Sequence, residues 1–104
     1  MNRTVRISEE AEAEAAEASR WYNARRPGLG DEFLVALDEA LERIELKPER
    51  GSRSPGVSSG DVRRVIMRRF PYDVVYIELP DRVQVLAVAH ERRRPGYWID
   101  RIRG

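Results

Sequence analysis

The spacing of apolar residues changes once along the chain, near residue 50. From residue 9 to residue 46, apolar side chains recur every three or four positions, which is the period of an amphipathic α-helix. From residue 62 to residue 90 they alternate with other side chains or form short apolar runs, as in β-strands. This order predicts an α+β fold, in which helices and strands occupy separate layers.

The N-terminal segment is predicted to form a short strand followed by a helix. Residues 4–7 alternate between polar and apolar side chains, which is typical of a strand. Ser8 is a good N-cap, so the first helix is expected over residues 9–25. Near the end of this helix, Trp21 and Tyr22 are expected to pack in the core or within the helical hairpin rather than to form a site.

Residues 26–30 contain a proline and two glycines and interrupt the helical pattern. Asp31 is expected to cap a second helix, which ends near Leu46, before Pro48. Its apolar stripe consists of Phe33, Leu34, Leu37, Leu41 and Ile44. Because about five residues join the two helices, they are predicted to form an antiparallel hairpin.

The second half of the chain is predicted to be a loop followed by three strands. Residues 49–61 are rich in glycine and serine, and a loop of about 13 residues is long enough to suggest a function. The strands are expected over residues 62–70, 72–79 and 83–90. Since their connections are short, they should form an antiparallel meander.

The pattern of each strand also predicts which side chains share a face of the sheet. On the middle strand, Tyr72, Val74 and Tyr76 should face one side and Val75, Ile77 and Leu79 the other. On the last strand, Val83, Val85, Ala87 and Ala89 should oppose Leu86 and Val88. The predicted architecture is β-α-α-β-β-β over residues 1–104, one domain in which the helical hairpin packs on a mostly antiparallel sheet.

Composition excludes several classes of protein. The chain has no cysteine and a single histidine, His90, so a disulfide scaffold, a thiolate metal site and a histidine-rich metal site are all excluded. We therefore expect neither a metal nor another cofactor. No apolar run approaches the roughly 20 residues of a membrane span, and the first residues lack the apolar core of a signal peptide. A cytoplasmic protein without membrane contact is expected.

The net charge of +1 conceals an uneven distribution of charge. Residues 1–50 contain 8 basic and 12 acidic side chains, whereas residues 51–104 contain 11 basic and 6 acidic ones. Every basic residue except Lys47 is an arginine, whose planar guanidinium suits carboxylates and phosphates. Acidic charge should thus lie mostly on a solvated helix face, and basic charge on the sheet and the C-terminal tail.

Several segments, in this order and spacing, resemble the toxins of RelE/ParE-type toxin–antitoxin modules. These segments are residues 26–33 (RPGLGDEF), 48–50 (PER), 69–72 (RFPY), 75–76 (VY) and 85–93 (VLAVAHERR). The resemblance extends over residues 4–98 and implies the same β-α-α-β-β-β fold. It also implies a bacterial growth-inhibiting toxin that a cognate antitoxin holds inactive in a hetero-oligomeric complex.

Two mechanisms occur among toxins of this kind. RelE-like toxins cut mRNA on the ribosome, a reaction that needs a proton acceptor, cations for the developing phosphorane charge and a donor for the leaving oxygen. If this chain is such an endoribonuclease, the resemblance implies catalytic roles for His90, Arg93 and Tyr97. Arginines 63, 64, 68 and 69 would then provide cationic support.

ParE-like toxins instead poison DNA gyrase and need a contact surface rather than a catalytic set. The residues expected to contact the target are Arg68, Arg69, Arg92, Arg94 and Trp98. Two departures from the nuclease pattern favour this reading. Glu91 stands where the last-strand arginine of the nucleases aligns, and residues 51–60 contain Arg53 but no lysine. Gyrase is thus the favoured target, the ribosome with its mRNA is the alternative, and an inactive module is a third possibility.

Each candidate residue also has a structural interpretation. His90 can be a hydrogen-bonded strand end, and Trp98 can cover the end of the sheet. Arginines 92 to 94 can form a solvated turn, and at least two of arginines 63, 64, 68 and 69 can be solvated edge charges.

Overall fold

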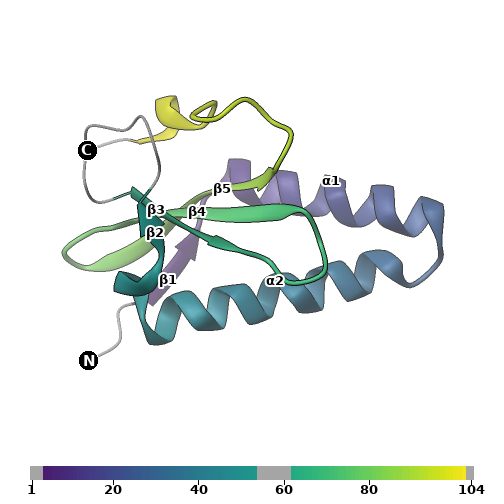
Figure 1. Cartoon of the computed structure of the whole chain (residues 1–104), viewed down its shortest axis with the longest axis horizontal. Helices are drawn as coiled ribbons and strands as arrows, with labels where there is room; N and C mark the ends of the chain where they lie inside the picture. The colour runs from purple at the N-terminus through teal and green to yellow at the C-terminus, as the bar shows by residue number, and fades with distance from the viewer. Residues whose placement is uncertain (1–3, 54–61, 103–104) are drawn as a thin grey trace.

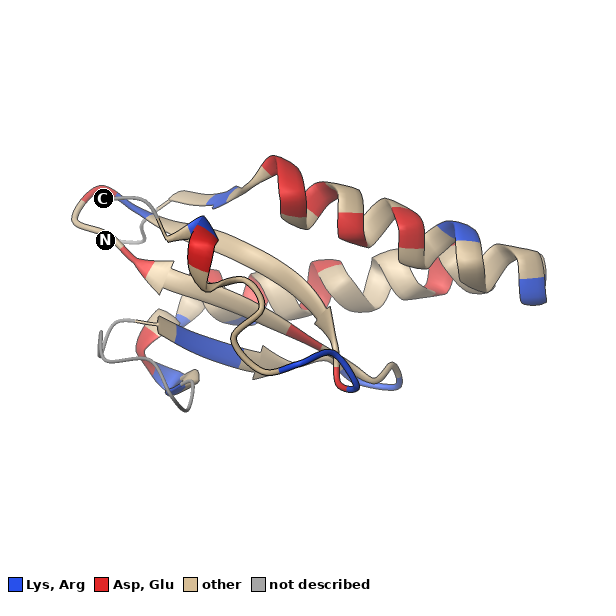
Figure 2. Ribbon diagram, turned by 90° about the horizontal axis from the view of Figure 1, so that it is seen from above, with Lys and Arg blue, Asp and Glu red and all other residues tan. Residues whose placement is uncertain are grey.

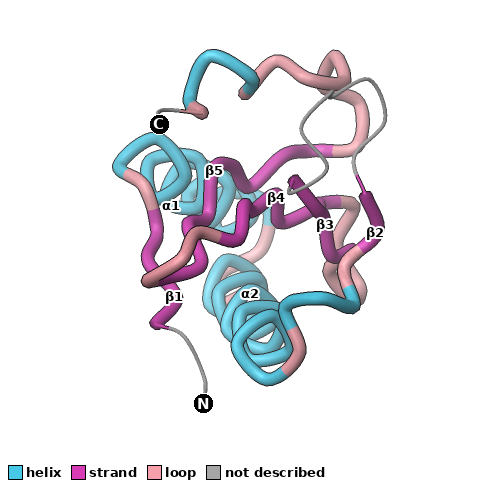
Figure 3. The backbone as a smooth tube through the Cα atoms, turned by 90° about the vertical axis from the view of Figure 1, so that its left-hand side faces the viewer, coloured by secondary structure: helices cyan, strands magenta, loops and turns pink. Residues whose placement is uncertain are grey.

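Two helices cover one face of a five-stranded sheet, and the C-terminal tail covers the other face (Figures 1 and 3). The structure is a computed structural model that describes residues 4–53 and 62–102. The elements are β1 (Thr4–Ile7), α1 (Glu9–Arg25), α2 (Leu29–Leu46), β2 (Ser52–Arg53), β3 (Val62–Ile66), β4 (Tyr72–Glu78) and β5 (Arg82–His90), with short 3-10 turns η1 (Pro48–Arg50) and η2 (Ile99–Arg101).

The strand order in the sheet is β1-β5-β4-β3-β2. β1 lies at one edge and runs parallel to β5, and the other three pairings are antiparallel. The α+β class and the β-α-α-β-β-β order with a mostly antiparallel sheet are therefore confirmed. Within the described residues, neither helix is both long enough and apolar enough to cross a membrane.

α2 begins at Leu29, earlier than the start predicted from a cap at Asp31. Gly28 occupies the N-cap position with φ at 92°, a left-handed backbone that glycine adopts without strain. The side-chain oxygen of Asn23 accepts hydrogen bonds from the backbone N–H of Gly28 (3.1 Å) and of Gly30 (2.8 Å). The predicted cap at Asp31 is therefore wrong, because Asp31 already lies in the first turn of the helix. The cap at Ser8 is confirmed, since its hydroxyl accepts from Ala11 N.

β3 is shorter than predicted, because it ends at Ile66 rather than at Phe70. Arg69 has φ at 70°, and a strand cannot continue through this left-handed backbone. The predicted loop over residues 49–61 also differs, because Ser52–Arg53 adds an edge strand beside β3. Residues 54–61 of that loop lie outside the described part of the chain.

The sheet separates two apolar clusters. The cluster on the helix side contains side chains of α1 and α2 with Met67, Phe70, Val74, Tyr76, Val83, Val85 and Val88. The cluster on the tail side contains Val62, Val75, Ile77, Leu86, Ala87, Ala89 and Trp98. The predicted faces of β4 are confirmed.

The predicted faces of β5 are confirmed as far as Leu86, which opposes Val83 and Val85, and are wrong beyond it. The consecutive β4 residues Val75 and Tyr76 pair with Ala87 and Val85 of β5. Leu86, which lies between these two, is therefore an extra residue in a β-bulge. The bulge turns Ala87 and Ala89 to the tail side and Val88 to the helix side. One extra residue reverses the alternation because side chains alternate with a period of two.

The two tryptophans have opposite environments. Trp98 is 3% exposed and belongs to the tail-side cluster. Trp21, which was expected to be packed, is 52% exposed, with the Arg25 guanidinium carbon 4.2 Å from the centre of its ring. The neighbouring Tyr22 does pack as expected, with its ring centre 5.5 Å from that of Phe33.

Candidate contact surfaces

Two turns that carry arginines lie side by side at one end of the sheet. The first arginine turn is residues 67–71, between β3 and β4, and the second arginine turn is residues 91–96, after β5. They are joined by a hydrogen bond of 2.9 Å from Glu91 N to Pro71 O. Figure 2 shows basic residues in blue on both turns, whereas α1 carries bands of acidic residues in red. The structure thus brings together four of the five predicted contact residues: Arg68, Arg69, Arg92 and Arg94.

Carboxylates of α2 neutralise the first arginine turn. Arg69 donates to Glu32 Oε1 at 2.8 Å, and Arg68 lies 2.9 Å from Glu39 Oε1. The hydrogen bond from Arg69, together with the nearby Arg26, lowers the pKa of the Glu32 carboxyl. These ion pairs attach the turn to the helix layer.

In the described part of the chain, no carboxylate neutralises the arginines of the second arginine turn. Arg92, Arg93 and Arg94 are all exposed, and among the described residues none of them forms an ion pair. The guanidinium carbon of Arg93 lies 3.9 Å from the centre of the Tyr97 ring, which is a cation–π contact. Three adjacent cations therefore face solvent.

The three residues predicted for catalysis also come together. His90, Arg93 and Tyr97 line one small hollow of about 120 Å³. His90 Nδ1 accepts a hydrogen bond of 3.0 Å from Arg92 N, and its ring lies edge-on to Tyr72 with 5.0 Å between ring centres. His90 thus has the hydrogen bond that its structural interpretation predicts.

The hydroxyl of Tyr97 is held by a network that the sequence does not reveal. It donates to Glu14 Oε2 at 2.5 Å, while Arg101 Nη1 donates to Glu14 Oε1 at 2.9 Å. The same carboxylate accepts from the backbone N–H of Val88 at 3.0 Å. Burial, reinforced by the hydrogen bond to Glu14, raises the pKa of Tyr97. The Tyr97 hydroxyl is therefore held as a donor to Glu14, and its phenolate form is disfavoured.

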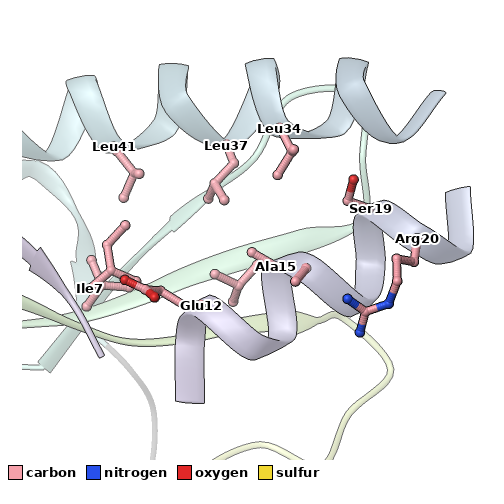
Figure 4. A pocket seen from close by; sticks show the side chains of 11 residues that line it. Ile7, Glu12, Ala15, Ser19, Arg20, Leu34, Leu37 and Leu41 are labelled. Atoms are coloured by element: carbon pink, nitrogen blue, oxygen red, sulfur yellow. The ribbon is translucent and has the colours of Figure 1, made fainter. Parts of the chain in front are cut away.

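An open apolar groove lies between the two helices and β1 (Figure 4). Its volume is about 390 Å³. Leu34, Leu37 and Leu41 of α2 point into it from one side, and Ala15 of α1 lies on the other. Of the predicted apolar stripe, Leu37 is buried but Leu34 is 38% exposed, so part of the stripe forms an accessible wall.

A second groove, of about 510 Å³, lies between α1 and the end of β5. Its lining mixes aromatic, acidic and basic side chains: Glu14, Glu17, Trp21, Tyr22, Tyr72, His90 and Arg93. It ends at the second arginine turn, since Arg93 belongs to both. Within the described residues, no group of three His, Cys, Asp or Glu side chains is arranged to hold a metal ion.

Comparison with known proteins agrees with this architecture. The family model of the ParE toxin of the type II toxin–antitoxin system parDE matches residues 5–95, so the chain belongs to this toxin family. A chain of the solved chromosomal ParDE toxin–antitoxin system from P. aeruginosa has the same fold, with a TM-score of 0.73 and 15% identity over 85% of this chain and 95% of that chain. No curated protein matches this sequence. The predicted membership of the RelE/ParE group, on its ParE-like side, is confirmed.

Proposed function

We propose that this toxin inhibits bacterial growth by poisoning DNA gyrase when it is free of its antitoxin. The observation that carries the proposal is the ParE family match over residues 5–95. Gyrase acts on DNA in the cytoplasm, which is where the proposal places the toxin. The second arginine turn is the proposed target contact. Arg68 and Arg69 are assigned the structural role of attaching the first arginine turn to α2. Trp98 is left out of the contact because its side chain is buried.

The state of Tyr97 supports gyrase over the ribosome. A leaving oxygen in RNA cleavage needs a proton donor that is free to reach it. The Tyr97 hydroxyl already donates to Glu14, and its ring is covered by Arg93. Glu91, which the resemblance aligns with an arginine of the nucleases, lines the same hollow as His90, Arg93 and Tyr97 and would add negative charge beside the phosphate that is attacked.

The alternative, a ribosome-dependent mRNA endoribonuclease, is favoured by one observation. His90, Arg93 and Tyr97 share a hollow, as an acid–base pair with a cation would. This alternative requires Tyr97 to exchange Glu14 for the substrate.

We also propose that an apolar segment of the cognate antitoxin binds in the groove between α1 and α2. Leucine side chains form one wall of the groove and the small Ala15 and Ala16 leave room on the other. Such a lining suits the apolar face of an amphipathic helix. Glu12 and Arg20 at the groove can pair with charges on that helix.

The gyrase proposal is tested with purified toxin in a DNA supercoiling assay and a DNA cleavage assay. The toxin should block supercoiling and accumulate cleaved DNA, and premixing with the antitoxin should abolish both effects. In parallel, transcripts from arrested cells are examined for cuts at A-site codons. Intact gyrase activity at concentrations that stop growth would refute the proposal, and cut transcripts would establish the alternative.

The antitoxin groove is tested by two substitutions at neighbouring positions of α2. Leu34→Asp places a charge in the groove, whereas Val35→Asp places it on the 69% exposed Val35, which does not line the groove. Only the first should weaken the complex, by tenfold or more (about 1.4 kcal/mol). Equal effects, or an affinity that falls steeply with salt, would contradict apolar docking here.

A further inference from the structure

The second arginine turn combines charge with a fixed backbone. The backbone N–H groups of Glu91, Arg92 and Arg93 donate to Pro71 O, His90 Nδ1 and His90 O at 2.9, 3.0 and 2.9 Å. Arg94 O and Gly96 O accept from Tyr97 N and Ile99 N at 3.2 and 2.9 Å. A turn that is already ordered loses little conformational freedom when a partner binds. The backbone that carries the three arginines is therefore already ordered before a partner binds.

The surroundings concentrate positive potential at this turn. Arg68 and Arg69, in the adjoining turn, are already neutralised by Glu39 and Glu32. Arg64 of β3, which lines the same hollow as Arg93, pairs with Asp73 at 3.2 Å. Among the described residues, the unpaired positive charge of the two turns is therefore that of the triplet Arg92–Arg94. It exceeds the single negative charge of Glu91 in the same turn, so the surface can attract a polyanion.

We infer that Arg92, Arg93 and Arg94 bind backbone phosphates of double-stranded DNA. Guanidinium groups donate paired hydrogen bonds to phosphate oxygens, and adjacent cations can bridge successive phosphates of a duplex. The choice of DNA as the occupant rests on the proposed function, because gyrase holds DNA where the toxin must act. The apolar groove proposed for the antitoxin shares no residue with the triplet, so this surface does not need that partner.

The test is the salt dependence of binding to a short fluorescent DNA duplex, measured by anisotropy with the full-length toxin. Each phosphate contact changes the slope of log K against log salt by about 0.9. Three contacts therefore predict a loss in affinity of about 40-fold between about 50 and 200 mM salt. With R92A/R94A, the loss should fall to about 3-fold to 4-fold.

R68A/R69A is the matched variant, because it removes the same charge from the neighbouring turn. Its slope should equal that of the unaltered toxin. R92K/R94K, which keeps the charge on the second arginine turn, should also keep the slope. Thermal unfolding shows whether each variant is folded, and substitution of exposed side chains should leave it unchanged.

Three results would overturn the inference. They are the absence of duplex binding by the unaltered toxin, an equal change of slope in the two alanine variants, and equally tight, triplet-dependent binding of a polyglutamate peptide. The last result would assign the surface to an acidic protein segment. Failure of the proposed function has a different signature, namely duplex binding through the triplet without any effect on gyrase.

Discussion

The two arginine turns lie side by side and have similar sequences, but the arginines of the first form ion pairs with α2 and those of the second are exposed to solvent. In the first, Arg68 and Arg69 reach back to carboxylates of α2, and in the second, Arg92 and Arg94 extend into solvent. The turns also differ in the type of residue that adopts a left-handed backbone, which is an arginine in the first turn and a glycine in the second. Each turn contains one left-handed residue, Arg69 with φ at 70° in the first and Gly96 with φ at 81° in the second.

The difference teaches that a count of basic residues does not locate a binding surface. A charge whose counter-ion belongs to the same chain mainly joins two elements of the fold. A charge without such a partner is available to another molecule. The location of carboxylates on α2 decides which arginines belong to which group.

The largest expected effect is on gyrase inhibition, which substitutions in the second arginine turn should weaken far more than substitutions in the first. R92A/R94A should raise the toxin concentration needed to inhibit gyrase about 100-fold, as expected for two charged hydrogen bonds worth about 1.5 kcal/mol each. R68A/R69A should change it less than about threefold. The measurement is a supercoiling titration with each purified variant. Similar losses in both variants would show that net charge, and not its location, determines inhibition.

A substitution at Gly96 should break the second turn without touching a charge. Gly96→Ala forces a Cβ into a left-handed backbone and places it 2.9 Å from Ile99 Cδ1. We expect a loss of about 1–2 kcal/mol in the free energy of unfolding, measured by urea denaturation. Inhibition of gyrase should weaken as well, although all three arginines are present. An unchanged stability would mean that the turn tolerates another backbone conformation.

Removing the carboxylates that pair with the first arginine turn should let this turn bind a polyanion, as is proposed for the second. E32Q/E39Q removes the two carboxylates, so Arg68 and Arg69 become available to a polyanion. Duplex affinity at low salt should rise about fivefold, the equivalent of about 1 kcal/mol. The control D31N/D38N removes the same charge from α2 at positions that form no ion pair with the described residues of either turn. An equal gain in the control would indicate a general charge effect.

Replacing Arg69 by glycine, the reverse of the change at Gly96, should have a small effect on the free energy of unfolding. Arg69→Gly relieves the left-handed strain but removes an exposed ion pair and adds freedom to the unfolded chain. These contributions nearly cancel, so the free energy of unfolding should stay within about 0.5 kcal/mol of the unaltered protein. Urea denaturation alongside Gly96→Ala provides the contrast. A loss as large as that of Gly96→Ala would show that the ion pair dominates.

Acid should loosen only the first turn, which is the smallest expected effect. The hydrogen bond from Arg69 lowers the pKa of Glu32 in the folded protein. Its stabilising effect is therefore present above the ordinary glutamate pKa of about 4.3 and is lost as the pH falls through the lower folded-state value. Hydrogen exchange across that range should increase in residues 67–71 before residues 91–96. Simultaneous loss of protection would indicate global unfolding instead.

Local patterns were sufficient to predict both helices, four of the five strands and the family. The cap at Ser8, the proline–glycine break and the alternating strands are all decided by neighbours within a few residues. The bulge at Leu86 was missed, because an extra residue in an apolar run leaves no mark in the alternation. The left-handed Arg69 was missed because the residue type that adopts such a backbone is usually glycine.

The candidate site could be predicted only as a set of residue types. Arg69 and Arg92 look alike in the sequence, and the carboxylate that distinguishes them, Glu32, is 37 positions from Arg69. The partner of Tyr97 is farther still, since Glu14 is 83 positions away. Such contacts depend on how the layers pack, which periodicity does not report.

The network around Glu14 also closes an edge of the sheet. β1 pairs with β5 only as far as Val85, and no other strand in the described part of the chain covers the rest of that edge. There, Glu14 accepts from Val88 N and Arg101 donates to Leu86 O at 3.0 Å. Two charged side chains therefore occupy backbone groups that could otherwise pair with a strand from another molecule. The contacts that hold the tail in place thereby also protect the protein from aggregation through this edge.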